Sequence, residues 1–67
     1  MLSVEEVRQK LRDACLEAGS ENAWAKANGL SQPYVNDTIK GRREPGAGIL
    51  RALGLKRIIG YEPSGIR

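Results

Sequence analysis

The 67-residue sequence lacks histidine and phenylalanine and contains a single cysteine, Cys15. Without histidine, no side chain has an ordinary pKa near neutral pH for acid–base catalysis, and no imidazole is available to bind a metal ion. One cysteine can form neither an intrachain disulfide nor a zinc site built from several thiolates. We therefore expect a protein that is not an enzyme and that uses no metal or other cofactor.

Long apolar segments are also absent. No run of 18 consecutive apolar residues occurs, and the N-terminal MLSVEEVRQK has no apolar signal core. We expect a cytoplasmic protein that does not bind membranes, in which Cys15 stays reduced as a small core residue. Because a chain of this length buries only roughly 60% of its unfolded surface, it has room for one thin core and no deep pocket for a small-molecule ligand.

Positive charge is in modest excess and unevenly placed. Lys and Arg number 11 against 8 Asp and Glu, and most of these cations follow residue 21. Lys40, Arg42 and Arg43 form a short basic cluster. This pattern suits a surface that meets phosphates, although a solvated charged face would give the same composition.

Capping residues and glycines divide the chain into predicted helices. Ser3 and Glu6 form a capping box, and Leu2 is placed to pack on Val7, so the first helix should begin near residue 3. Its apolar positions recur at the helical period and are Val4, Val7, Leu11, Ala14, Cys15 and Ala18. The predicted helices span residues 3–18, 20–28, 31–41 and 46–53. The sequence therefore predicts an all-α fold, a compact bundle of four short helices with an extended C-terminal tail.

The second and third predicted helices are joined by a turn of about three residues around Gly29, the geometry of a helix-turn-helix. Ser31 caps the third helix, and Pro33 is tolerated in its first turn because the first N–H groups of a helix have no internal partner. The expected inner face of the third helix consists of Val35, Thr38 and Ile39.

The run AWAKANGLSQPYVNDTIKGRREPG resembles the helix-turn-helix of the Cro/C1-type (XRE) family of phage and bacterial repressors. In that family a small residue, here Ala25, lies where the second helix crosses the third. A glycine with positive φ follows four residues later, here Gly29. The resemblance covers residues 20–55 and is completed by Leu30, Ser31 and Val35.

Two positions in this run differ from the residues usual in the family. Trp24 stands in the place of a core aliphatic residue. Thr38 also stands where an aliphatic residue is usual, and we expect the adjacent Ile39 to fill the same space.

The resemblance implies that the third helix enters the major groove of double-stranded DNA. Asn and Gln can bond adenine N6 and N7, Asp can accept from cytosine N4, and a proline ring or tyrosine edge can touch a thymine methyl. The predicted base-contacting residues are Gln32, Pro33, Tyr34, Asn36 and Asp37. A polar outer face would, however, be present on any helix of a soluble protein.

Phosphate contacts are expected around that helix, and they set affinity without reading sequence. The start of the second helix presents N–H groups to a phosphate, although Glu21 opposes an anion there. The predicted phosphate-contacting residues are Ser20, Asn22, Lys40, Arg42 and Arg43.

Residues 55–61 are rich in β-forming residues. One interpretation is a chain end that packs Leu55 and Ile58 on the first and fourth helices. The other is a short exposed strand that pairs with its copy in a homodimer. The expected organisation is a helix-turn-helix domain over residues 1–55 and a tail over residues 56–67. The predicted dimer interface is Ile58, Ile59 and Tyr61.

These patterns predict a sequence-specific DNA-binding regulator of transcription, most simply a repressor of phage or mobile-element type that binds an inverted-repeat operator. One alternative is a protein-interaction module, such as an antitoxin or adaptor, that uses the same helices to hold a partner. RNA binding is a third option, although no aromatic-rich sheet for base stacking is evident.

Overall fold

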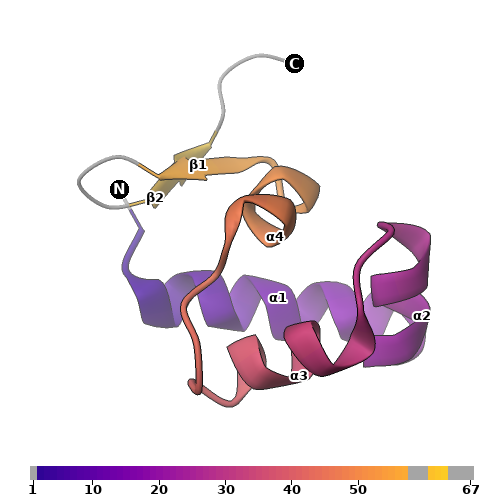
Figure 1. Ribbon diagram of the computed structural model, residues 1–67. Coiled ribbons are helices and arrows are strands. Elements are labelled where there is room, and N and C mark those ends of the chain that lie inside the picture. Colours follow the sequence, from indigo (N-terminus) through magenta and orange to yellow (C-terminus); the bar gives the residue numbers. More distant parts are fainter. Residues whose placement is uncertain (1, 58–60, 64–67) are drawn as a thin grey trace.

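Four α-helices are followed by a two-stranded hairpin in the computed structural model, which describes residues 2–57 and 61–63 (Figure 1). The elements are α1 (Val4–Ala18), α2 (Glu21–Ala27), α3 (Gln32–Ile39), α4 (Ala47–Ala52), β1 (Leu55–Arg57) and β2 (Tyr61–Pro63). The predicted all-α bundle of four short helices is confirmed. Among the described residues, no helix combines the length and the apolar character needed to cross a bilayer.

α1 begins at the capping box that the sequence predicts. The Ser3 hydroxyl accepts the N–H of Glu6 at 3.2 Å, and the Glu6 carboxylate accepts the N–H of Ser3 at 2.8 Å. These bonds hold the pKa of Glu6 below its usual value, the backbone bond most strongly, because they favour the ionised carboxylate. Leu2 packs on the cluster that contains Val7, as expected.

The inner face of α1 is a line of residues spaced four apart. Val7 and Leu11 are fully buried, and Cys15 is 4% exposed. Cys15 is therefore a small core residue, as expected, and its burial raises the pKa of its thiol. Ala18 was predicted on the same face but is exposed, because α1 ends at this residue and the chain turns away at Gly19.

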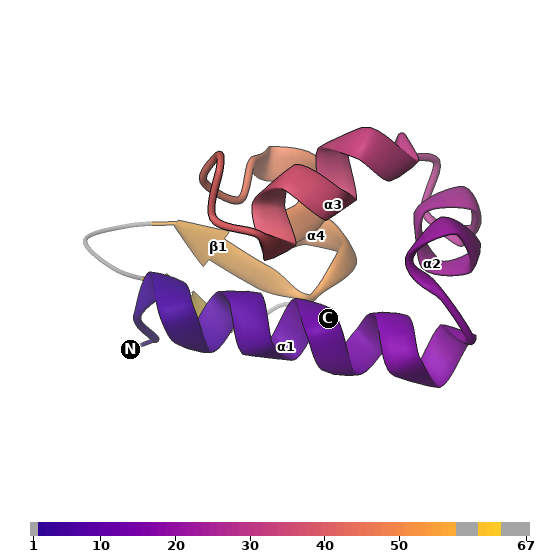
Figure 2. The ribbon, with the colours of Figure 1, turned by 90° about the horizontal axis from the view of Figure 1, so that it is seen from below.

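α2 and α3 are two short helices joined by a tight turn, as predicted (Figure 2). The side chains of Ser20 and Ser31 cap the two helices, each by accepting the backbone N–H three residues further on. Between them Gly29 takes a φ of 68°, a left-handed conformation that favours glycine. The N–H of Leu30 then returns to the carbonyl of Ala25 at 2.8 Å and closes the turn.

All four helices contribute to one main core. Its buried members are Leu11, Cys15, Trp24, Ala25, Val35 and Ile49. Trp24 is 7% exposed, so it occupies a core position as expected. A second cluster joins α1, α4 and β1 through Val7, Leu50 and Leu55.

Thr38, rather than Ile39, fills the central core position on α3. Thr38 is fully buried, whereas Ile39 lies partly exposed at the edge of the core. The Thr38 hydroxyl donates to the carbonyl of Tyr34 at 2.9 Å, so its polar group is satisfied within the helix and its methyl group can pack as that of valine would. The expectation that Ile39 fills this space is therefore wrong.

The C-terminal segment turns back on itself. β1 and β2 pair in antiparallel register, with Leu55 opposite Pro63 and Arg57 opposite Tyr61. The β-forming residues predicted after residue 54 include a short strand, β1, which pairs with β2 of the same chain. Leu55 is buried on α1 and α4, as one interpretation predicted.

Candidate nucleic-acid interface

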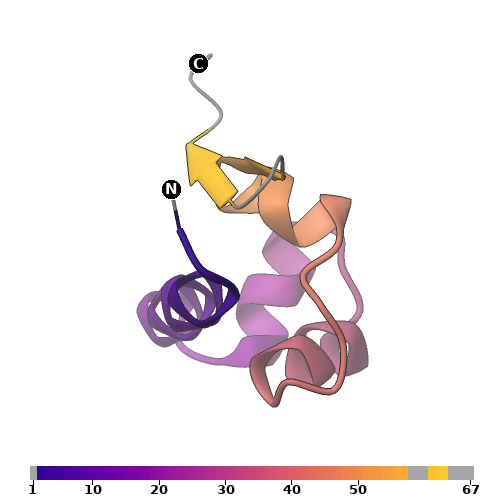
Figure 3. The same ribbon diagram turned by 90° about the vertical axis from the view of Figure 1, so that its left-hand side faces the viewer.

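The side of α3 that faces away from the core is polar. On its inner side Val35 and Thr38 are fully buried. The accessible or partly accessible residues on its other side are Gln32, Pro33, Asn36, Asp37 and Lys40. α3 and the hairpin lie on opposite sides of the molecule (Figures 1 and 3). We call this polar side the outer face of α3, and it carries four of the five predicted base-contacting residues.

A carboxylate from α2 lies against the outer face. Oε1 of Glu21 accepts a hydrogen bond from Nδ2 of Asn36 at 2.9 Å and a longer one from Nε2 of Gln32 at 3.4 Å. Glu21 is the first residue of α2, and the two amides lie one turn apart on α3. The sequence indicated only that Glu21 would oppose a phosphate. Its contact with both amides was missed, because no local pattern records how two helix faces meet.

Tyr34 makes internal contacts instead of lying on the outer face. Its ring packs against the main core, and its hydroxyl accepts the N–H of Gly46 at 2.9 Å. The guanidinium carbon of Arg43 lies 5.0 Å from the centre of the ring. Because these contacts hold Tyr34 between α3 and the segment that leads to α4, we leave it out of the base contacts proposed below.

The basic cluster lies where the chain leaves α3. Lys40 is the C-cap residue of α3, and Lys40, Arg42 and Arg43 are all exposed. The Arg42 guanidinium lies 3.6 Å from the Asp37 carboxylate in a solvent-exposed pair, which contributes little to stability. Three predicted phosphate-contacting residues are thus brought together at the C-terminal end of α3.

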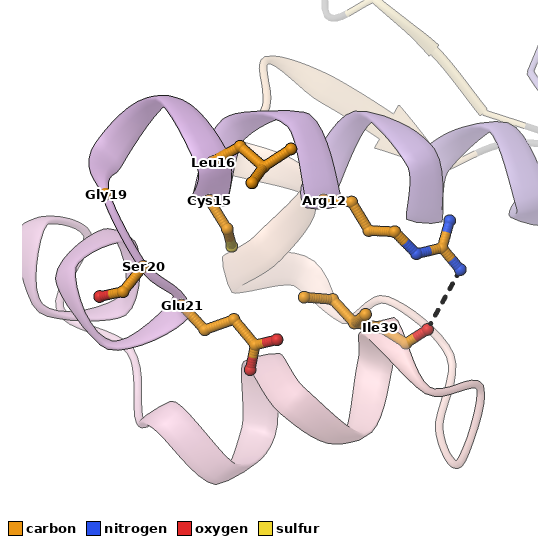
Figure 4. Close-up of a pocket in the computed structure, with 7 residues that line it drawn as sticks. All are labelled: Arg12, Cys15, Leu16, Gly19, Ser20, Glu21 and Ile39. Carbon is orange, nitrogen blue, oxygen red and sulfur yellow. Dashed lines mark hydrogen bonds between the residues drawn. The ribbon is translucent and has the colours of Figure 1, made fainter.

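Two arginines of α1 hold that same end of α3. Nε of Arg8 donates to the Thr38 carbonyl at 3.1 Å, and Nη2 of Arg12 donates to the Ile39 carbonyl at 3.5 Å (Figure 4). Cations at this position complement the helix dipole, and Arg8 adds a charged donor to the Thr38 carbonyl, which also accepts the backbone N–H of Gly41 at 3.2 Å. This role was not predicted from the sequence. The available signal was the spacing of Arg8 and Arg12, which places two cations four residues apart on one side of α1.

The remaining predicted site residues lie at the start of α2, in β2 or outside the described residues. Ser20 uses its hydroxyl to cap α2, and Asn22 is exposed in the first turn of α2. Tyr61, predicted at a dimer interface, is the first residue of β2. Ile58 and Ile59, predicted at the same interface, lie outside the described residues.

An open hollow of about 380 Å³ lies beside the outer face of α3 (Figure 4). Residues from the C-terminal half of α1, the start of α2 and the end of α3 line it: Arg12, Cys15, Leu16, Gly19, Ser20, Glu21 and Ile39. Leu16 is 78% exposed, and no other large hydrophobic side chain is so exposed among the residues whose side chains the structure describes. The hollow therefore offers a partly apolar surface next to the polar outer face of α3.

No family model, curated protein or solved structure matches the chain. A function must therefore be inferred from the outer face of α3 and its surroundings.

Proposed function

We propose that the protein is a sequence-specific double-stranded DNA-binding regulator of transcription, of the phage or mobile-element repressor type. α3 is the helix that enters the major groove in this proposal. The observation that carries it is the outer face of α3, which combines accessible amides with a cluster of exposed cations at one end. A single helix fits the major groove, which is about 12 Å wide.

The base contacts come from the accessible residues of the outer face. Gln32 and Asn36 can each bond an adenine edge, and Asp37 can accept from cytosine N4. Pro33 is exposed and can touch a thymine methyl. Each well-formed bidentate contact discriminates against the wrong base by about 1–3 kcal/mol.

The phosphate contacts come mainly from Lys40, Arg42 and Arg43, because their exposed charges flank the end of α3. Ser20 and Asn22 contact the backbone on the opposite side in this proposal. The carboxylate of Glu21 weakens that second contact by repelling phosphate.

We further propose that the active form is a cytoplasmic homodimer without a cofactor or a small-molecule ligand. One α3 offers too few base contacts for a regulator, whereas two copies about 34–36 Å apart would read an inverted repeat. The tail around Ile58, Ile59 and Tyr61 is the proposed interface. Since the hairpin lies on the side away from α3 (Figure 1), a dimer built through the tail leaves both outer faces accessible.

A protein-interaction module is the second candidate function, and the hollow favours it. Exposed apolar side chains at a hollow are typical of surfaces that bury against another protein. Leu16 is the residue through which an antitoxin or adaptor would bind its partner here. Such binding would depend only weakly on salt.

Binding of labelled duplexes, followed by fluorescence anisotropy at several salt concentrations, separates the two functions. We expect affinity to fall steeply with salt, and Arg42→Ala and Arg43→Ala each to lower the magnitude of the logarithmic slope by about 1. Lys10→Ala, at an exposed position of α1, is the matched control and should leave the slope unchanged. Absence of duplex binding even at low salt would contradict the proposal and favour the protein-interaction module.

A further inference from the structure

A small hydrogen-bonded cluster links α2 to α3 and consists of the side chains of Glu21, Gln32 and Asn36. The Glu21 side chain extends from the start of α2 towards α3 (Figure 4), where one of its oxygens meets both amide nitrogens. All three residues are partly buried, so the cluster is partly shielded from water. The contact to Asn36 is the shorter, at 2.9 Å against 3.4 Å for Gln32.

The carboxylate fixes the direction in which the two amides point. An ionised carboxylate can only accept hydrogen bonds, so the amide atom that faces Glu21 must be nitrogen. Because an amide is planar, the carbonyl oxygen of Asn36 then points away from Glu21, and its nitrogen keeps one further N–H. Without this contact, the terminal torsion of either amide has two orientations of similar energy.

We infer that Glu21 is a positioning residue that sets the base preference of the DNA site by fixing the orientation of Asn36 and Gln32. This inference rests on the proposed DNA binding. An oxygen that points outward is an acceptor, so it selects a base with an amino group in the major groove, adenine or cytosine. Guanine presents only acceptors, N7 and O6, at that edge and is disfavoured at the contacted position.

The expected loss of DNA affinity follows from the fraction of time that each amide spends in the competent orientation. An amide that flips freely is in the competent orientation about half of the time, so affinity for the preferred site falls about twofold per amide and about fourfold for the two amides of each half-site. Removal of the Glu21 charge should raise affinity for all DNA sequences about equally, because the carboxylate repels phosphates whatever the base sequence. The ratio of affinities for preferred and scrambled duplexes therefore isolates the orienting effect.

Glu21→Gln tests this, because glutamine has the same shape but no charge and can donate as well as accept. We expect it to lower the preferred-to-scrambled affinity ratio about fourfold or more and to admit guanine at the contacted position. Glu17→Gln removes the same charge at an exposed position of α1 and should leave the ratio unchanged. A merely destabilised protein would bind both duplexes less without changing the ratio. An unchanged ratio and base preference in Glu21→Gln would overturn the inference.

A measurement without DNA tests the contact itself. In the intact protein the side-chain amide protons of Asn36 should exchange with water more slowly than those of the exposed Asn22, and Glu21→Ala should remove the difference. Equal exchange in the unsubstituted protein would overturn the inference even if DNA binds. If no duplex binds, the proposed function fails and the inference with it, and the exchange rates show whether the contact failed as well.

Discussion

The hydroxyl of Tyr34 accepts the backbone N–H of Gly46 at 2.9 Å. This bond links the first turn of α3 to the residue before α4, so it spans the loop that carries Lys40, Arg42 and Arg43. A Cβ atom at residue 46 would overlap the Tyr34 hydroxyl, so the close approach requires glycine there. The pair therefore holds the basic cluster in place beside α3.

Tyr34→Phe removes the acceptor and keeps the ring. We expect the free energy of unfolding to fall by about 1 kcal/mol, because the Gly46 N–H loses its partner while the ring still packs on the core. Urea denaturation followed by circular dichroism measures this loss. Base preference should stay as in the unsubstituted protein. A changed preference at one base pair would return Tyr34 to the base-contacting residues.

Gly46→Ala places a methyl group where the Tyr34 hydroxyl lies. We expect it to destabilise the protein by about 1–3 kcal/mol, as overpacking does. The same substitution should cost less in a protein that already carries Tyr34→Phe, because the obstructing oxygen is gone. A double-mutant cycle in urea tests this. Effects that add within about 0.5 kcal/mol would show that the two residues do not interact.

Arg8→Ala should destabilise the protein by about 1–3 kcal/mol. The Arg8 side chain is only 12% exposed, and its loss leaves the Thr38 carbonyl at the end of α3 without a charged donor. Lys10→Ala is the control from the exposed side of α1 and should change stability by less than about 0.5 kcal/mol. Thermal unfolding compares the two variants, and equal effects would show that Arg8 does not anchor α3.

The Cys15 thiol should react slowly with a thiol reagent in the folded protein. Burial restricts access to it and raises the pKa of the thiol, so less thiolate is present at a given pH than in the unfolded chain. The rate measured near pH 8 should rise strongly when urea unfolds the protein. Similar rates in the two states would place Cys15 outside the core.

Local signals explain which parts of the fold could be predicted from the sequence. The Ser3 capping box and the positive φ of Gly29 each depend on a few neighbouring residues, and both are present in the structure. Thr38 was correctly predicted on the inner face, but Ile39 was wrongly expected to fill its space, because the internal hydrogen bond of Thr38 makes a polar residue suitable for the core. That bond runs to the carbonyl four residues earlier in the same helix, and a hydrophobic pattern does not record it.

The candidate site was less predictable for a related reason. Gln32 and Asn36 were both predicted to contact bases, and the structure places them one turn apart on the outer face of α3. The side chains that contact α3 come from other helices. Glu21 of α2 bonds the outer face of α3, and Arg8 and Arg12 of α1 bond carbonyls at its C-terminal end. Their positions follow from the packing of whole helices. The pairing of β1 with β2 was likewise missed, because three-residue strands give almost no periodic signal.

The central claim, that α3 reads double-stranded DNA, is tested most directly by selecting bound sites from a pool of random duplexes. The expected result for the unsubstituted protein is an inverted repeat with half-sites about one helical turn apart. Asn36→Ala and Gln32→Ala should each lose preference at one base pair per half-site, with an affinity loss of about 1–3 kcal/mol on the original site. A pool without enriched sequences, or the same consensus from all three proteins, would contradict the claim.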